Sequence, residues 1–145
     1  TRSILSSTIH THQRQRASRS SKQPDKDMPA VSRKLTFAEL AAGPCKPLSD
    51  AGYRLDGAGL AEPLALLPGW ERDGEAIAKS FSFPGYEATL SFVNAVARIA
   101  QEQDHHPDIA FGYNRCRIAW STHSVGGVSL NDLICAAKIE ALPRP

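Results

Sequence analysis

The sequence predicts an α+β fold: a four-stranded, mainly antiparallel sheet with three helices packed on one face, in the order α-β-β-α-β-β-α. Two observations carry this prediction. Segments that alternate apolar and polar residues, which is typical of half-buried strands, occur as two adjacent pairs. Segments with an apolar stripe at helical spacing flank and separate these pairs. In addition, no β-α-β run is long enough to build a parallel sheet, so each strand pair is expected to be antiparallel.

The region before the first strand pair contains the weakest helix signals. Leu35 to Ala42 is compatible with a short helical turn, which Gly43 and Pro44 end. Between Leu48 and Leu67, leucines recur at roughly helical spacing, but two glycines and Pro63 weaken that helix. A proline is tolerated in the first turn of a helix, so we expect a helix if Pro63 lies there.

Four strands are predicted in two hairpins. Asp73-Gly74 is a strong hairpin signal, and the strand after it, Ala76 to Phe83, buries one face. Asp108 to Tyr113 and Arg115 to Thr122 also alternate, with a tight turn at Asn114 between them.

Two longer helices have clear sequence signals. Tyr86 to Gln103 has a single apolar stripe, and this helix must end near His106 because Pro107 disfavours helical geometry in the residue before it. The last helix is predicted from about Ser129 to Leu142, with Ser129 as its N-cap.

Residues 1–27 differ in composition from the rest. They are rich in Ser, Thr, Arg and Gln, so we expect them to be disordered. The same composition is typical of an organellar transit peptide. The only methionine, Met28, instead looks like a natural start, so that residues 1–27 would be a leader that lies upstream of it. This is the interpretation that we prefer. Residues 28–145 are then one domain, which we expect to be cytoplasmic, or organellar if residues 1–27 are a transit peptide.

Charge and hydropathy exclude several classes. The formal net charge of the chain is +2, and the region from Met28 onward is close to neutral, so we expect no direct nucleic-acid binding. No apolar run approaches the roughly 18–20 residues that cross a bilayer, so we expect no membrane association. Cys45, Cys116 and Cys135 form no C-x-x-C motif, which argues against a zinc knuckle or redox dithiol and for reduced thiols.

The chemistry of the chain is concentrated in two histidine-containing runs. These are Asp104-His105-His106-Pro107 and Ser121-Thr122-His123. Histidine suits proton transfer near neutral pH because its ordinary pKa lies there. The start of one strand in an antiparallel hairpin lies beside the end of the next, so His123 is predicted to lie beside the His105-His106 pair. Neighbouring side chains in extended chain point to opposite sides, so the two rings are expected to have different tasks.

Alternatives remain for these residues. Asp132 lies three residues after Ser129, where it could cap the helix, or it could orient a nearby histidine. Three histidines and an aspartate could bind a divalent metal. The adjacent His105 and His106 diverge, however, and no H-E-x-x-H motif is present, so we favour a metal-free acid–base site.

With these residues in place, the chain resembles the pterin-4a-carbinolamine dehydratase family. The order of elements from Leu60 to Leu142 is similar to that family's, whereas residues 1–27 lie outside the resemblance. The matching residues are Asp104-His105-His106-Pro107, Tyr113-Asn114, Ser121-Thr122-His123, Gly127, Ser129 and Asp132.

The resemblance implies an activity. The family removes water from 4a-hydroxytetrahydrobiopterin to give quinonoid dihydropterin, which recycles the cofactor of aromatic amino acid hydroxylases. The reaction needs a proton for the leaving 4a-hydroxyl group and the loss of the N5 proton, and imidazoles suit both transfers. The pterin is the substrate, and neither a metal nor an organic cofactor is required. The implied roles are general acid–base catalysis for His105 and His123 and pterin binding and orientation for His106. Asp104, Ser121 and Thr122 are expected to line the site through side chain or backbone, and Asp132 to support the histidines.

One position departs from the family pattern. The family often has an acid four residues before the first histidine of the pair, where this chain has Gln101. The neighbouring Glu102 lies about 100° further around the helix, so it is not an obvious substitute.

An alternative to the enzyme is a non-enzymatic dimerisation or assembly partner of the same fold. Retention of all three histidines favours the enzyme. The resemblance also implies a homodimer or homotetramer, and a possible functional link to an aromatic amino acid hydroxylase.

Overall fold

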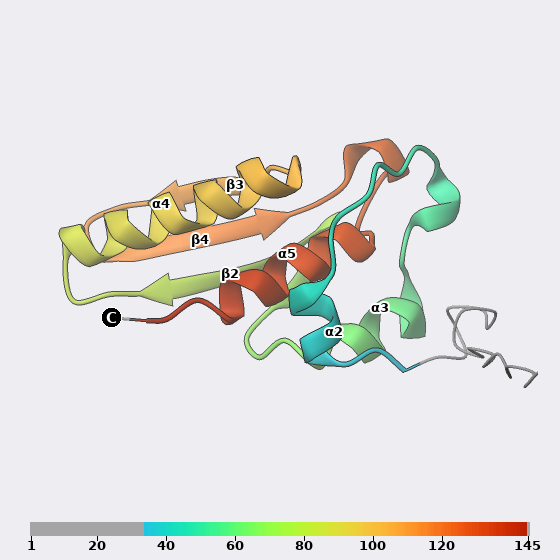
Figure 1. Ribbon diagram of the computed structural model, residues 1–145, viewed down its shortest axis with the longest axis horizontal. Coiled ribbons are helices and arrows are strands. Elements are labelled where there is room, and N and C mark those ends of the chain that lie inside the picture. Colours follow the sequence, from blue (N-terminus) through green and yellow to red (C-terminus); the bar gives the residue numbers. More distant parts are fainter. Residues whose placement is uncertain (1–33, 145) are drawn as a thin grey trace, which may run out of the picture. The chain divides into compact units, whose positions relative to one another are not determined.

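The fold is organised by an antiparallel sheet of four strands in the computed structural model, which describes residues 34–144 (Figure 1). The strands are β1 (Glu71–Asp73), β2 (Ala76–Ser82), β3 (Asp108–Phe111) and β4 (Arg115–Trp120). They lie in the order β1-β2-β4-β3, and all neighbours are antiparallel. The predicted α+β fold is therefore confirmed.

Both predicted hairpins are present. Gly74 has a φ of 63° in the turn between β1 and β2, which a glycine adopts without strain. Gly112 N–H donates to the Arg115 carbonyl at 3.0 Å and closes the turn between β3 and β4. Both strands of this hairpin are shorter than predicted. In particular, β4 stops before Thr122, whose N–H and C=O bond instead to Gly127 in a separate bridge.

Four α-helices occur among the described residues: α2 (Phe37–Ala42), α3 (Gly57–Leu64), α4 (Tyr86–Gln103) and α5 (Leu130–Glu140). Figure 1 shows α4 and α5 side by side on one face of the sheet, with α2 against α5. The bounds of α4 agree with the prediction, and the short helical turn predicted near residue 35 is the complete helix α2. Two short 3-10 helices, η2 (Ala51–Tyr53) and η3 (His123–Val125), lie in the connecting segments.

The leucine-rich segment before β1 differs from its predicted arrangement. Its helical part begins at Gly57, so Pro63 falls in the last turn of α3 and not in the first. The helix ends at Leu64, one residue after this proline. Of the leucines in this segment, Leu60 and Leu67 are buried. The segment is therefore kept in place by packing, which propensity alone does not reveal.

Aromatic rings connect the sheet to α4. The ring of Phe92 on α4 lies 4.7 Å from that of Phe81 on β2 and 5.0 Å from that of Phe83. Trp70 packs edge-on against Phe81 at 6.1 Å. Such pairs stabilise by about 0.5–1.5 kcal/mol beyond the area that they bury. This packing fixes α4 on the sheet, and with it the direction in which the chain leaves the helix.

Residues 35–144 form one compact unit. The predicted leader at residues 1–27 and Met28 lie outside the described residues. No helix within residues 34–144 is long and apolar enough to cross a membrane.

Candidate active site

The C-terminal end of α4 places the first histidine run. Helix α4 ends with Asp104 in the left-handed conformation, with φ 52° and ψ 42°. Aspartate tolerates this region better than most residues with a Cβ. His105 N–H then donates to the Ala100 carbonyl at 3.1 Å, which is a helix-ending pattern that reverses the chain. As a result His105 turns toward the core and is partly buried, whereas His106 is exposed.

The His105 ring is held on two sides. It stacks on the Trp120 ring, with centroids 5.3 Å apart and an angle of 20° between the planes. Its Nε2 lies 2.5 Å from Asp132 Oδ1 on α5. Because a carboxylate only accepts, Nε2 carries the proton in this pair. The second ring nitrogen, Nδ1, is therefore the one that remains for a substrate.

Asp132 is completely buried and serves two elements at once. Its Oδ2 accepts the Ser129 N–H at 2.8 Å, which is half of the capping box of α5. The same oxygen accepts the Thr122 hydroxyl at 2.8 Å, while Oδ1 pairs with His105. The two alternatives for Asp132 thus coexist, because a carboxylate has two oxygens and enough lone pairs for all three donors.

The buried carboxylate changes the acidity of the histidine. Burial by itself lowers the pKa of His105, but the hydrogen bond to Asp132 and the charge of its carboxylate act in the opposite direction and raise it. The charges of Cys45 and Asp104 also raise it. The net result is that the pKa of His105 lies above its ordinary value. A ring whose pKa is raised keeps its second proton to a higher pH than an ordinary imidazole, and it can deliver that proton from Nδ1.

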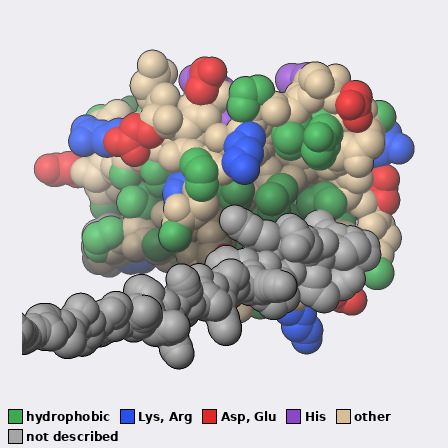
Figure 2. All heavy atoms as spheres, turned by 45° about the vertical axis from the view of Figure 1, so that its right-hand side comes forward, with side chains coloured by type: hydrophobic (Ala, Val, Ile, Leu, Met, Phe, Trp, Pro, Cys, Tyr) green, Lys and Arg blue, Asp and Glu red, His purple; other side chains and the backbone are tan. Residues whose placement is uncertain are grey.

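The second histidine run approaches this pair from β4. Thr122 and His105 bond to opposite oxygens of the Asp132 carboxylate, so the two runs meet there. His123 follows Thr122 directly and is exposed at the start of η3. The pairing of Asp108 with Ala119 also puts the beginning of β3 beside the end of β4. The topological argument for bringing the runs together is therefore supported. Figure 2 shows histidine side chains reaching the surface at one edge of the molecule.

The remaining predicted residues differ in accessibility. Asp104 is exposed and Ser121 is half-buried, so both can meet a ligand. Thr122 is only 6% exposed, and its hydroxyl bonds to Asp132 and lies 2.8 Å from the Ser129 hydroxyl. The contribution of Thr122 is thus to position Asp132. Gln101 and Glu102 are exposed on α4, and neither takes part in the hydrogen bonds that hold His105.

Sequence reasoning missed two contributions. Trp120 is buried in the core, and it also forms the surface on which His105 stacks. The segment after α2 reaches the same region, since Cys45 N–H donates to Gln103 Oε1 at 2.9 Å, two residues before His105. Periodicity could have placed Trp120 on the helix-facing side at the end of β4. No sequence signal marks the contact of Cys45.

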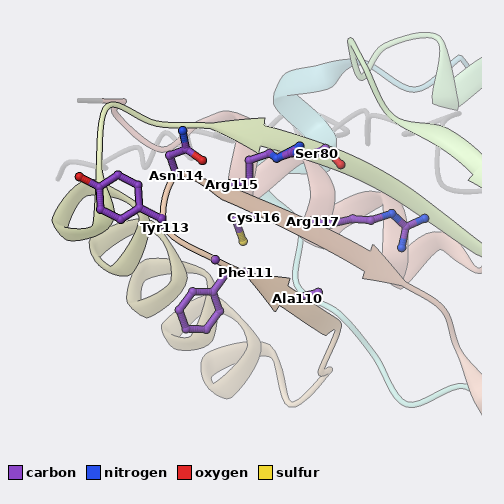
Figure 3. A pocket seen from close by; sticks show the side chains of 9 residues that line it. Ser80, Ala110, Phe111, Tyr113, Asn114, Arg115, Cys116 and Arg117 are labelled. Carbon is purple, nitrogen blue, oxygen red and sulfur yellow. The ribbon is translucent and has the colours of Figure 1, made fainter.

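Two further features bear on the kind of site. No group of three His, Cys, Asp or Glu side chains within residues 34–144 is arranged to hold a metal ion. A hollow of about 490 Å³ lies at the β3–β4 hairpin, where Figure 3 shows Arg115, Arg117 and Tyr113 around it. Its lining includes none of the predicted site residues. We therefore place the candidate site at the His105–Asp132 pair, where fold and geometry define an α+β protein with a histidine–carboxylate acid–base pair.

Comparison with known proteins places the chain more narrowly. Residues 53–142 match the profile of the family described as pterin 4 alpha carbinolamine dehydratase, and the chain belongs to that family. A protein of Nitrosospira multiformis, provisionally named pterin-4-alpha-carbinolamine dehydratase, is 47% identical over 107 residues, which cover 74% of this chain and 95% of the relative. A Stenotrophomonas maltophilia protein with the same provisional name is 49% identical over 105 residues, covering 71% and 90%.

Among solved structures, the chain is similar to the transcriptional coactivator/pterin dehydratase of Brucella melitensis. The TM-score is 0.59 and the sequence identity 36%, and the match covers 61% of this chain and 96% of that protein. The resemblance inferred from the histidine runs is thus confirmed at the level of the family.

Proposed function

We propose that this protein dehydrates 4a-hydroxytetrahydrobiopterin to quinonoid dihydropterin and water by histidine acid–base catalysis that needs no metal ion. The observation that carries the proposal is the His105–Asp132 pair, with Nε2 and Oδ1 2.5 Å apart beside the second histidine run. Family membership supports the substrate class.

The reaction requires two proton transfers. The C4a–O bond of the carbinolamine breaks, and its electron pair leaves with oxygen, which takes a proton and departs as water. The nitrogen lone pair at N5 forms the C4a=N5 double bond, and the N5 proton goes to a base. Groups with a pKa near the working pH accelerate such transfers by about 10²–10⁴-fold.

The site residues divide these tasks. His105, whose pKa is raised, donates a proton from Nδ1 to the leaving hydroxyl. His123, which is exposed and directly follows Thr122, takes the N5 proton. His106 binds and orients the pterin, with Asp104 and Ser121 lining the site. Asp132, held by Thr122 and Ser129, keeps the proton of His105 on Nε2 and stabilises the imidazolium.

The test uses chemically generated 4a-hydroxytetrahydropterin, whose dehydration is followed by absorbance with and without the purified protein. We expect acceleration that a chelator does not reduce. An unchanged rate would refute the activity, and loss of acceleration with chelator would refute catalysis without a metal ion.

Variants test the roles. Replacing both His105 and His123 by Ala should remove most of the acceleration, about 10²-fold or more. Ser124→Ala is the control for the change at His123, because Ser124 is exposed next to His123 and its hydroxyl bonds to the Leu48 carbonyl. This control should retain the wild-type rate. A double histidine variant that retains a near wild-type rate would overturn the assignment.

A second candidate is a binding role without catalysis. It is favoured by one observation, the similarity to a protein that is named both coactivator and pterin dehydratase.

The proposed dehydratase would act in the cytoplasm as a homodimer or homotetramer, supplying recycled pterin to an aromatic amino acid hydroxylase. Light scattering on the purified chain measures the oligomeric state, and a mass equal to that of one chain would refute this part.

A further inference from the structure

Two cysteines that are distant in the sequence meet next to the candidate site. Cys45 Sγ lies 3.5 Å from Cys135 Sγ, although the residues are 90 positions apart. Cys45 belongs to residues 44–50, which we name the strap, between α2 and η2. Figure 1 shows the strap running along α5. Cys135 is fully buried on α5, one turn after Asp132, whereas Cys45 is half-buried.

The strap is fastened beside Cys135 by several hydrogen bonds. Lys46 N–H donates to Asn131 Oδ1 at 3.0 Å, and the Asn131 amide donates back to the Lys46 carbonyl at 2.7 Å. Cys45 N–H donates to Gln103 at the end of α4. These bonds involve Cys45 itself and the residue that follows it. The contact between the sulfurs is therefore built into the fold.

The two thiols have opposite electrostatic settings. The hydrogen bond between the two sulfurs lowers the pKa of Cys45, against burial, and the charges of His105 and Lys138 lower it further. The same hydrogen bond and burial raise the pKa of Cys135. The accessible sulfur is thus the nucleophile and the buried one its proton donor, which is the asymmetry that reactive dithiols have.

We propose that Cys45 and Cys135 are a peroxide-oxidisable dithiol that closes an intramolecular disulfide between the strap and α5. The Cys45 thiol loses its proton, and the thiolate attacks the terminal oxygen of a hydroperoxide, so that the O–O bond breaks and Cys45 becomes a sulfenic acid. The leaving oxygen takes up the proton that the thiol lost and departs as an alcohol or water. Cys135 sulfur then attacks Cys45 sulfur and the S–O bond breaks. The hydroxide takes the Cys135 proton and leaves as water. Two thiols are oxidised by two electrons, and one peroxide is reduced.

The geometry allows the second step. The sulfurs must approach from 3.5 Å to about 2.0 Å, and the strap that carries Cys45 has no regular secondary structure to resist this. Formation of the neutral sulfenic acid also removes the thiolate of Cys45, whose charge is one cause of the raised pKa of Cys135. The first step therefore makes the second thiol easier to ionise.

Cys116 provides an internal control. It is 1% exposed on β4, and burial raises its pKa to about 11. It should remain a thiol while the other two react.

The test treats the full-length reduced protein with one equivalent of hydrogen peroxide, then denatures and alkylates it for mass spectrometry. We expect one alkylated cysteine in place of three, a loss of two hydrogen atoms before alkylation, and a cross-linked peptide pair containing Cys45 and Cys135. The oxidised chain should also unfold at a higher temperature than the reduced chain, because the disulfide closes a long loop. These readouts do not depend on dehydratase activity, so they stand apart from the test of the proposed function.

Two variants make the result specific. Cys45→Ser changes a half-buried side chain on the strap, and should leave two alkylated cysteines after peroxide. Cys116→Ala should still form the cross-link and leave none. Three alkylated cysteines in the oxidised wild type, a disulfide that includes Cys116 or joins two chains, or oxidation of Cys45 beyond sulfenic acid without a cross-link would overturn the proposal.

Discussion

Replacing Asp132 by Asn tests the acid–base pair at its centre. The change keeps the shape of the side chain, and its amide oxygen can still accept from Ser129 N–H and the Thr122 hydroxyl. The amide NH₂ then faces His105 Nε2, which must accept and therefore cannot carry a proton. The variant loses a charge-assisted hydrogen bond at a carboxylate that is fully buried. Such a bond contributes about 1.5–3 kcal/mol, so we expect the free energy of unfolding to fall by about 2 kcal/mol at low pH.

The loss should depend on pH with a definite sign. The pKa of His105 is higher in the folded chain than its ordinary value, which is about 6.5. Stabilisation from the pair is therefore fully present below about pH 6.5 and is lost as the pH rises through the folded pKa. The difference between wild type and Asp132→Asn should shrink, to about 1 kcal/mol or less, when His105 is neutral in both proteins.

Urea unfolding at about pH 5.5 and about pH 8.5 measures this difference by linear extrapolation. Thr122→Val is the matched control, because it removes one hydrogen bond to the same carboxylate without involving a titratable group. It should cost about 1 kcal/mol at both pH values. An Asp132→Asn loss that is equal at the two pH values would refute the reasoning.

Three further predictions concern the same region of the molecule. His123→Ala should lower kcat at least about 10²-fold if the residue is a proton acceptor, whereas His106→Ala should mainly raise KM. Steady-state kinetics of both variants separates the two roles, and the reverse pattern would assign catalysis to His106 and binding to His123. Ser129→Ala should lower the free energy of unfolding by about 0.5–2 kcal/mol, measured by urea unfolding, because it removes the N-cap of α5; an unchanged midpoint would contradict the capping role. The pKa of His105, measured by NMR titration, should fall in Cys45→Ser, because the charge of Cys45 raises it in the wild type alongside those of Asp132 and Asp104; a higher value would contradict the electrostatic argument.

Several elements were predictable because their signals are local. The stripe of Tyr86 to Gln103 and the capping box begun by Ser129 depend on residues within a few positions of each other, and both helices form close to the predicted bounds. The Asp73-Gly74 turn is a signal of the same local kind. The segment around Pro63 was placed less well, because its conformation is decided by the burial of its leucines against residues far away in the sequence.

The site was predictable in part. Antiparallel topology indicated that the two histidine runs meet, and the Asp132 carboxylate bonds to a residue of each. The roles of the individual residues within the two histidine runs could not be predicted from topology. Thr122 was predicted to line the site through its side chain or its backbone. Its side chain is buried on Asp132, which the local pattern does not indicate because burial depends on how β4 ends against α5.

The sequence by itself determined the kinds and order of the elements, the histidine runs and the family, because periodicity, turn residues and motif spacing are properties of neighbouring positions. Only the tertiary structure decided which carboxylate oxygen meets which donor, and that Trp120 supports the ring of His105. It also decided that Cys45 and Cys135, which spacing had argued against as a redox pair, lie 3.5 Å apart. These contacts join residues far apart in the chain, and their distances follow from the packing of α4, α5 and the strap around one core.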